Sequence, residues 1–443
     1  MTTNSRSKIN QVLPLAGLLI GLWAGPARAE GGMAMGESMK MERPSRLEVP
    51  LMDPREANGT AWQPAATPLF AKMRMAGKYM LMFHWNATLD FNHGGGRLGE
   101  TQVGSSNWWM GMAARPVGAG RLMLRTMVTA EPWTWGLRGY PELFQGDEVL
   151  HGVAIENRMH PHDLFMELAA EYDRPVGRNL VWHVYAAPVG DAALGSAVFL
   201  HRLSASDNVE APLGHDQEDE PHGSYGVVTT GLTRGPVRVE GSVFNGRDPD
   251  ANNRYDFDFA SLSSYSGRVS YNPAPGWSFQ ISGGHLVGLE ASKPDVSSER
   301  ATASAHYTRS SERGYWATSL IWGQNHQQGD PKQASLTFES DWKQRGTAWF
   351  TRMESVQRLD LPGLSEGQRT TVKAMALGWV RDIQRTAGGD WAFGVQADLY
   401  VVPRVLRGAY GSHPASFHVF LRFRAPPLKS DTGSMESGGM PPM

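Results

Sequence analysis

Two imidazoles and a thioether lie close together in the segment Asn157–Asp163. His160 and His162 flank Pro161, whose ring fixes its own φ and biases His160 toward extended backbone, so both imidazoles can project to one side. Imidazole is a common ligand of copper and zinc, and Met159 would add a soft thioether. The alternative is structural, with these side chains hydrogen-bonded to neighbouring loops. We favour the structural interpretation, because two histidines without a third spaced ligand form a motif of low specificity.

Acidic residues and histidines crowd a second segment, the long loop Gly190–Pro221 and the residue that follows it. Carboxylates with histidines can collect divalent cations, and the imidazoles concerned are His201, His215 and His222. An acidic loop is more often a solvated surface, and one of this length can also fold back into a pore as a constriction. We therefore expect a solvated face or a constriction rather than a stoichiometric metal site.

Methionine supplies the third group of candidate ligands. In two predicted strands, these residues occupy the alternate positions that form the polar, inward face. They are Met80, Met82 and His84 in the first strand and Met123 and Met127 in a later one. Thioethers on a polar surface would suit a path for Cu(I) or Ag(I). The alternative is that methionine fills irregular space, as it does in protein cores.

The chain also carries methionines close to its two ends. Those near the start are Met33, Met35, Met39 and Met41. Exposed methionine in sequence of low order has no packing role, so we hypothesise metal contact there.

Motifs for enzymatic chemistry are not found. The sequence contains no G-x-S-x-G, H-E-x-x-H or Gly-rich phosphate loop, and Gly94–Gly96 is typical of a flexible loop tip. We therefore expect that the protein is not an enzyme, with no catalytic residue and no bound organic cofactor. Copper or silver ions are the metals that the methionines and histidines would take.

Strict alternation of apolar and polar residues predicts that the candidate ligands are carried by β-strands and the loops between them. From Tyr79 to Phe91, seven apolar positions alternate with polar or amphipathic ones, a period of two that indicates a β-strand. From there the chain contains about sixteen such runs, joined alternately by short turns and longer loops. This pattern predicts an all-β fold, a transmembrane antiparallel outer-membrane β-barrel of about sixteen strands, with fourteen or eighteen as alternatives. Short turns would then be periplasmic and long loops extracellular.

Composition and targeting signals agree with an envelope protein. A positively charged start, the apolar core Leu13–Trp23 and an A-x-A site at Ala27–Ala29 predict a secretory signal. The chain has no cysteine, which excludes disulfides and thiolate metal sites, and its net charge of -2 does not imply nucleic acid as a partner.

These signals divide the chain into four parts. The expected parts are a signal peptide (1–29), a Met/Pro-rich, mostly disordered periplasmic arm (30–77), the barrel (78–424) and a flexible Met-containing tail (425–443).

Several phrases resemble a known group of proteins: Tyr140–Gly146, Arg158–Met166, Ala211–His215 and Tyr255–Asp258. They are similar to a family of largely uncharacterised bacterial outer-membrane barrel proteins found beside copper and other heavy-metal resistance determinants. The resemblance covers roughly residues 108–273. It implies an envelope location and a metal-stress context, and it supplies no ligand residues.

Two functions remain open at this point. The first is a porin-like channel or metal-associated barrel in the outer membrane of a Gram-negative bacterium, acting in copper or silver handling or resistance. The second is a plugged structural or binding barrel whose Met and His residues scavenge metal or contact partner proteins. Expected partners are outer-membrane lipid, metal ions and periplasmic metal-handling proteins, and no nucleic acid.

Overall fold

The structure is a computed structural model, and it describes residues 49–219, 223–249, 251–289 and 293–428. All of these residues belong to one compact unit, Arg46–Met443. Among them, no helix is both long enough and apolar enough to cross a membrane.

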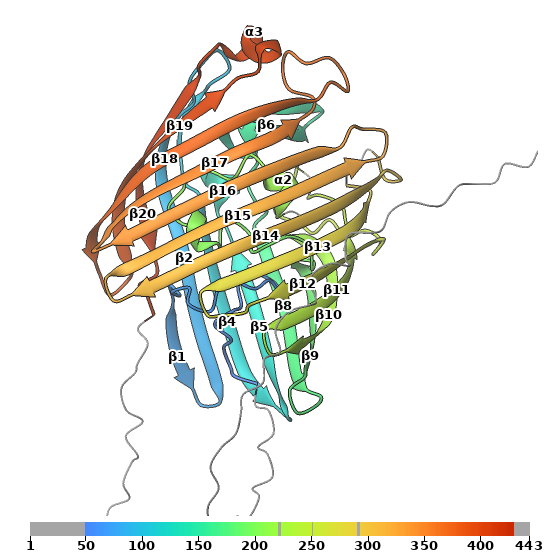
Figure 1. Cartoon of the computed structure of the whole chain (residues 1–443), viewed down its shortest axis with the longest axis vertical. Helices are drawn as coiled ribbons and strands as arrows, with labels where there is room; N and C mark the ends of the chain where they lie inside the picture. Colours follow the sequence, from blue (N-terminus) through green and yellow to red (C-terminus); the bar gives the residue numbers. More distant parts are fainter. Residues whose placement is uncertain (1–48, 220–222, 250, 290–292, 429–443) are drawn as a thin grey trace, which may run out of the picture. The chain divides into compact units, whose positions relative to one another are not determined.

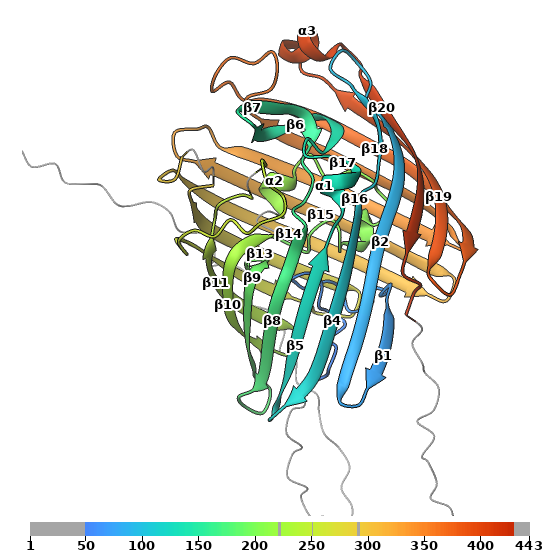
Figure 2. The ribbon, with the colours of Figure 1, turned by 180° about the vertical axis from the view of Figure 1, so that it is seen from behind.

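Within the described ranges, sixteen antiparallel strands close into a barrel (Figures 1 and 2). Each strand pairs with the next along the chain, and β20 closes the ring by pairing with β2, where Leu89 lies opposite Leu421. The barrel strands are β2 (Tyr79–His93), β4 (Asn107–Val117), β5 (Gly120–Val128), β8 (Phe165–Pro175), β9 (Val181–Gly190), β10 (Ser224–Arg234), β11 (Val237–Asn245), β12 (Ser264–Tyr271), β13 (Trp277–Val287), β14 (Ser297–Ser311), β15 (Gly314–Gln327), β16 (Gln333–Gln344), β17 (Thr347–Arg358), β18 (Thr370–Arg385), β19 (Asp390–Val401) and β20 (Ala415–Arg424). The predicted fold class and strand number are confirmed.

Shorter elements complete the fold. Strands β1 (Lys72–Ala76) and β3 (Thr101–Gly104) extend the pairing of β2 at its two ends. Strands β6 (Tyr140–Leu150) and β7 (Val153–Met159) form a separate hairpin. The short helices are α1 (Glu131–Thr134), η1 (Leu203–Ala205), α2 (His215–Glu218), η2 (Arg404–Leu406) and α3 (Arg407–Tyr410).

Short and long connections alternate around the barrel, as the sequence predicted. Seven short turns, such as 118–119 and 345–346, share one end of the barrel, and the longer loops share the other, which we call the long-loop end. Antiparallel neighbours need only tight turns at one end, so long insertions can gather at the other.

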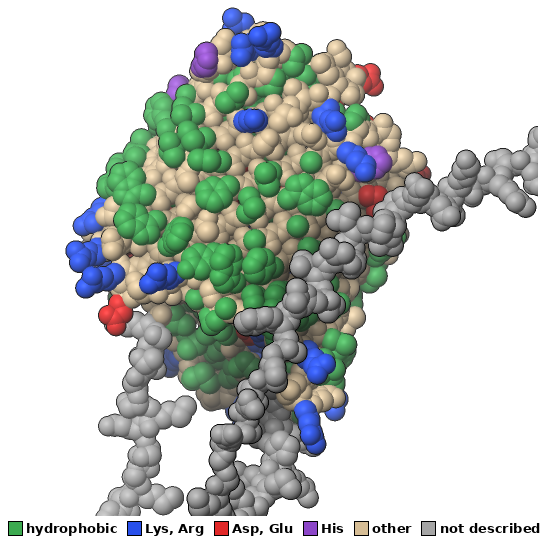
Figure 3. All heavy atoms as spheres, in the orientation of Figure 1, with side chains coloured by type: hydrophobic (Ala, Val, Ile, Leu, Met, Phe, Trp, Pro, Cys, Tyr) green, Lys and Arg blue, Asp and Glu red, His purple; other side chains and the backbone are tan. Residues whose placement is uncertain are grey.

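The outer face of the barrel is apolar and its inner face is polar. On β15, the exposed Leu320 and Trp322 alternate with the buried Ser319 and Ile321. Figure 3 shows hydrophobic side chains over the outer face of this part of the sheet, with Lys and Arg gathered toward the strand ends. Such a surface is expected where strands face lipid on one side only.

Tryptophans form a row across four neighbouring strands, and the first three of them lie three residues from the short turns. In the register of β15 to β18, Trp316 lies opposite Trp342, Trp342 opposite Trp349, and Trp349 opposite Trp379. The first three are among the exposed large hydrophobic side chains. A row of this kind is typical of the boundary between hydrocarbon and lipid headgroups.

Candidate functional site

The first segment inside the barrel is residues 49–71, which we call the N-terminal segment. Arg268 Nη2 donates to Thr60 Oγ1 at 2.8 Å, and Asn272 Nδ2 donates to the Gln63 carbonyl at 2.7 Å. The Trp62 ring contacts two guanidinium groups, with ring-centroid distances of 3.9 Å to Arg55 and 4.8 Å to Arg238. Of the two cations, Arg238 belongs to the wall, and it also donates from Nη1 to the Thr60 carbonyl at 3.2 Å, so stacking and hydrogen bonds together hold the segment against the inner wall.

This packing differs from the sequence expectation for residues 30–77. A mostly disordered periplasmic arm was expected there, but residues 49–71 are packed inside the barrel and Lys72–Ala76 form β1. The physical reason is that the inner wall supplies partners for both kinds of side chain in this segment: its polar groups are hydrogen-bonded, and Leu51, Met52 and Leu69 pack against buried methionines of the wall. Residues 30–48 lie outside the described residues, as does the predicted tail from residue 429 onward.

One ion-pair network anchors the N-terminal segment to β5 and β8. The guanidinium of Arg121 binds both carboxylate oxygens of Glu56, with one contact at 3.1 Å, and it also binds Asp173 Oδ2 at 2.7 Å. All three side chains are almost completely buried. Buried charges of this kind are stable only when they are paired, so Glu56 fixes the position of the segment.

The second segment inside the barrel is residues 191–219, which we call the central loop. Arg202 Nε lies 2.7 Å from Glu339 Oε2, and Arg202 Nη1 lies 2.9 Å from Asp219 Oδ2. Arg352 Nε shares the Glu339 carboxylate at 3.1 Å. Of the two sequence interpretations of this loop, the structure supports a constriction and excludes a solvated surface, because these groups are buried in the lumen.

A second anchor of the central loop is a cluster of one imidazole and three carboxylates. His418 Nδ1 lies 2.8 Å from Asp90 Oδ2, and His418 Nε2 lies 2.9 Å from Glu210 Oε1 and 3.4 Å from Asp398 Oδ2. Burial, together with the neighbouring Asp398, raises the pKa of Glu210 to about 7, although His418 acts in the opposite direction. Among the described residues, the ligand atoms of Glu210, Asp398 and His418 lie within 4.8 Å of one another. Because these atoms already pair with each other, the cluster serves here as an anchor.

The hairpin β6–β7 covers the central loop at the long-loop end. Tyr140 Oη accepts a hydrogen bond from the Ala211 amide at 2.9 Å, and Gln145 Nε2 donates to the Pro212 carbonyl at 3.2 Å. Arg358 of the wall donates to both segments, through Gln145 Oε1 and the Leu213 carbonyl. The lumen is thus occupied by three parts of the same chain.

The sequence-predicted segment Asn157–Asp163 combines structural anchors with a group of histidines. Asp163 Oδ2 accepts a hydrogen bond from Tyr225 Oη at 2.5 Å, and its other oxygen lies 3.2 Å from Arg254 Nη1. Arg158 donates to the backbone carbonyls of Arg138 and Gly139, just before β6. These contacts agree with the structural interpretation of the segment.

Three of the predicted ligand histidines converge at the long-loop end, and we call them the histidine cluster: His160, His162 and His215. The His160 ring centroid lies 6.4 Å from that of His162 and 6.5 Å from that of His215. His162 Nδ1 lies 2.7 Å from Glu131 Oε2, and His215 Nδ1 lies 2.6 Å from Asp219 Oδ1. In metal sites, a carboxylate that accepts a hydrogen bond from Nδ1 orients the imidazole, and Nε2 is then the ligand atom.

Met159 and His222 stand apart from this cluster. Met159 is buried with Trp135, Tyr140 and Val198 in a small apolar core. His222 lies outside the described residues, as do Met33, Met35, Met39 and Met41.

Methionines line one side of the lumen. The buried members of this methionine cluster are Met80, Met82, Met110, Met112, Met123, Met127 and Met166. The parity prediction that Met80, Met82, His84, Met123 and Met127 face inward is confirmed by their burial on the lumen side. Their role as metal ligands stays a prediction.

Three further methionines at this wall were not among the predicted ligands. Met110 and Met112 alternate with outward residues on β4, so the parity argument used for β2 applies to them too. Met166 lies at a register shift between β5 and β8, where it is buried with the cluster. His201, one of the predicted candidates of the central loop, reaches this wall, where its ring centroid lies 6.0 Å from that of His84.

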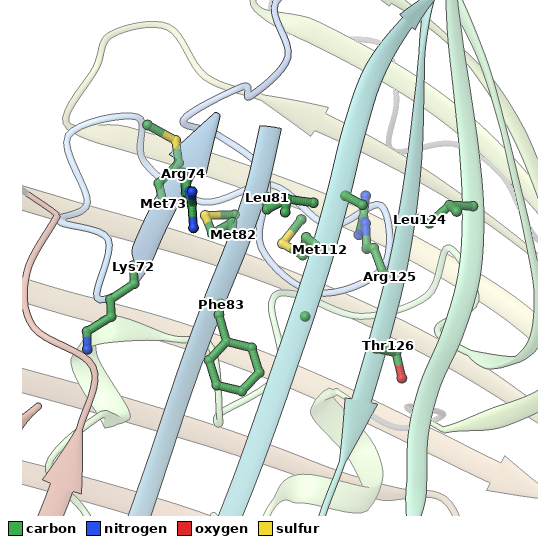
Figure 4. A pocket seen from close by; sticks show the side chains of 12 residues that line it. Lys72, Met73, Arg74, Leu81, Met82, Phe83, Met112, Leu124, Arg125 and Thr126 are labelled. Atoms are coloured by element: carbon green, nitrogen blue, oxygen red, sulfur yellow. The ribbon is translucent and has the colours of Figure 1, made fainter. Parts of the chain in front are cut away.

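A hollow of about 820 Å³ lies on strands β1, β2, β4 and β5, beside this wall (Figure 4). Leu81, Phe83 and Leu124 line it and are exposed large hydrophobic side chains. Figure 4 also shows Met82 and Met112 on neighbouring strands, in accordance with their pairing in the sheet.

Comparisons with known proteins give no family. No family model matches the chain, and no curated protein matches it, so the resemblance to barrels beside heavy-metal resistance determinants stays a prediction.

Similar solved structures include OmpF of Salmonella typhi in complex with daunomycin, with 9% identity, a TM-score of 0.48, and coverage of 80% of this chain and 100% of that one. An anion-selective porin from Comamonas acidovorans has 10% identity, a TM-score of 0.48, and coverage of 78% and 99%. OprB of Pseudomonas putida has 10% identity, a TM-score of 0.44, and coverage of 79% and 94%. The strand pairing of this chain, rather than these similarities, establishes the barrel.

Proposed function

We propose that the chain is an outer-membrane barrel that acts as a conduit held closed by its own N-terminal segment, hairpin β6–β7 and central loop. The apolar outer face and the row of tryptophans support a position in a lipid bilayer. A closed barrel leaves no unpaired strand edge, which is the condition for crossing a membrane with strands. The predicted signal sequence agrees with the outer membrane of a Gram-negative bacterium.

The observation that carries the proposal is how the charged inner wall finds its partners. Wall residues Arg121, Glu339 and His418 pair with Glu56, Arg202 and Glu210 of the inserted segments. Burying charged groups in an interior that never contains water costs desolvation free energy. Apolar side chains of similar volume would stabilise such a folded barrel equally well or better. A charged wall suits both a closed state, where the segments pair with it, and an open state, where water hydrates it.

Planar-bilayer conductance of three proteins tests this proposal. The wild type is compared with a variant lacking residues 49–70, and with a double variant in which short glycine-serine linkers also replace residues 141–158 and 192–219. We expect a closed wild type and a stepwise gain of conductance, with the double variant conducting steadily. Heat-modifiable migration in gels verifies that each barrel is folded.

A folded, inserted double variant that carries no current would refute the conduit. The protein would then be a structural or binding barrel. Steady current through the wild type would refute closure by the inserted segments.

A second candidate function is metal binding in copper or silver handling, with metal ions as the bound partner. The convergence of His160, His162 and His215, each of the last two with a carboxylate on Nδ1, supports it at the long-loop end. Calorimetric titration of the folded protein with Cu(II) or Zn(II) tests it. The variant His160→Ala/His215→Ala should lose one binding event that His326→Ala, an exposed histidine near the end of β15, retains. Equal binding by both variants would refute a metal role for the histidine cluster.

A further inference from the structure

The methionine cluster meets the central loop at two histidines. On the lumen face of β2 and β4, His84 lies directly opposite Met110, and Met82 lies opposite Met112. Directly opposed residues on one face have Cβ atoms about 4.5 to 5.5 Å apart. The thioethers of Met82, Met110 and Met112 are therefore within side-chain reach of the His84 ring.

His201 of the central loop completes this group from the other side. Its ring centroid lies 6.0 Å from that of His84 and 5.0 Å from that of Trp108. The adjacent loop residue, Leu200, packs directly against the methionine cluster. The loop thus brings a second imidazole to the methionine wall.

Both imidazoles carry a buried nitrogen that has no hydrogen-bond partner. His84 is more than nine-tenths buried, and neither its Nε2 atom nor that of His201 has a partner among the described residues. A buried polar atom without a partner costs roughly 1 to 3 kcal/mol, so the arrangement calls for a ligand. Burial, with the neighbouring His84 and Arg125, lowers the pKa of His201 to about 3, which keeps its ring neutral and able to coordinate.

We propose that the lumen holds a binding site for a soft monovalent cation, Cu(I) or Ag(I), where the methionine cluster meets the central loop. Its ligands are drawn from two imidazoles and three thioethers: His84, His201, Met82, Met110 and Met112. The inference rests on the metal-binding function proposed above as the second candidate, and it does not depend on the conduit.

The chemistry of these donors selects the metal. Thioether sulfur and neutral imidazole are ligands that Cu(I) and Ag(I) accept, whereas Zn(II) and other divalent cations favour imidazole with carboxylates or thiolates. Met123 is left out, because its sulfur accepts a hydrogen bond from Arg125 Nε at 3.3 Å.

The positive charge of Arg125 beside the site does not exclude a cation. Its guanidinium binds Glu171 and lies 3.8 Å from Glu167 Oε1, so its charge is compensated on the side facing β8. A monovalent ion is repelled less than a divalent one by any charge that remains.

Equilibrium dialysis of the folded full-length protein against silver nitrate, in chloride-free buffer, tests the site. The variant His84→Gln/Met110→Leu should bind one equivalent of Ag(I) fewer than the wild type. Two control variants should bind as much as the wild type. One is Met353→Leu, a methionine exposed on β17, and the other is His306→Gln, a buried histidine with an unpartnered Nε2 away from the methionines.

A second variant and a second readout guard against misfolding. His201→Gln lies in the loop rather than the barrel wall, and it should weaken Ag(I) binding at least tenfold. Nuclear magnetic resonance of ¹³C-methyl methionine should show the signals of Met82, Met110 and Met112 shifting with the first equivalent of Ag(I).

Undiminished Ag(I) binding by both variants would overturn the proposal, and so would Zn(II) displacing Ag(I) at equal concentration. A wild type that binds no Ag(I), but whose deletion variants conduct, would overturn the site and leave the conduit in place.

Discussion

The docking of the N-terminal segment can be weakened at a single carboxylate. Glu56→Gln removes the charge that pairs with Arg121, while Arg121 keeps Asp173 at 2.7 Å. Hydrogen bonds to a charged group contribute about 1.5 to 3 kcal/mol. At 1.36 kcal/mol for each factor of ten, the population in which the segment has left the lumen should rise roughly 10- to 150-fold.

Cysteine labelling measures this population directly, because the natural chain contains no cysteine. Ala61 is almost completely buried beside Trp62, so Ala61→Cys reports departure of the segment by reacting with a water-soluble maleimide. When the segment returns faster than the thiol reacts, the labelling rate follows the equilibrium population. Adding Glu56→Gln should therefore raise the rate by the same roughly 10- to 150-fold.

A matched control separates docking from a change of overall charge. Glu312→Gln removes one carboxylate from an exposed turn, and it should leave the labelling rate of Ala61→Cys unchanged. The reasoning fails if Glu56→Gln and Glu312→Gln give the same rate, since Glu56 would then not hold the segment in place.

Three further outcomes follow from the same structure. Glu339→Gln removes the carboxylate shared by Arg202 and Arg352, and loss of a buried partner at about 3 to 5 kcal/mol should produce current bursts in bilayers that are absent from the wild type. Leu320→Lys places a charge on the lipid face, and denaturant unfolding in vesicles should show a loss of about 2 to 4 kcal/mol, whereas Leu320→Ala should lose less. Because the pKa of His201 is lowered to about 3, its ring stays unprotonated on acidification from pH 7 to pH 5, so proton competition there should not weaken Ag(I) binding. An imidazole with the ordinary pKa of about 6.5 would instead lose affinity roughly 30-fold over that range.

The barrel itself was predictable because its signal is local. The alternation of apolar and polar residues within each run determines which side chains face lipid. Short turns such as 118–119 and 345–346 lie where this alternation ends. The inward direction of Met80 and Met82 followed from the same parity. Closure of the ring by β2 and β20 then required only an even number of strands.

The contents of the lumen were not predictable in the same way. Thr60 meets Arg268, and Glu210 meets His418, across 208 positions of the chain in each case, and no period links such residues. The N-terminal segment has little apolar pattern, so its packing depends on partners that the wall provides. The histidine cluster was partly predictable, because only Pro161 separates His160 from His162, but the approach of His215 depends on the folding of the central loop.

Single-channel recording of the wild type in mild urea tests most directly whether the inserted segments form a reversible closure. The account predicts no current without urea, stepwise current at urea concentrations that leave the barrel folded, and loss of that current after washing. Glu56→Gln should lower the urea concentration at which the steps begin. Steady current without urea, or silence up to the concentration at which the barrel unfolds, would contradict a closure made by the inserted segments.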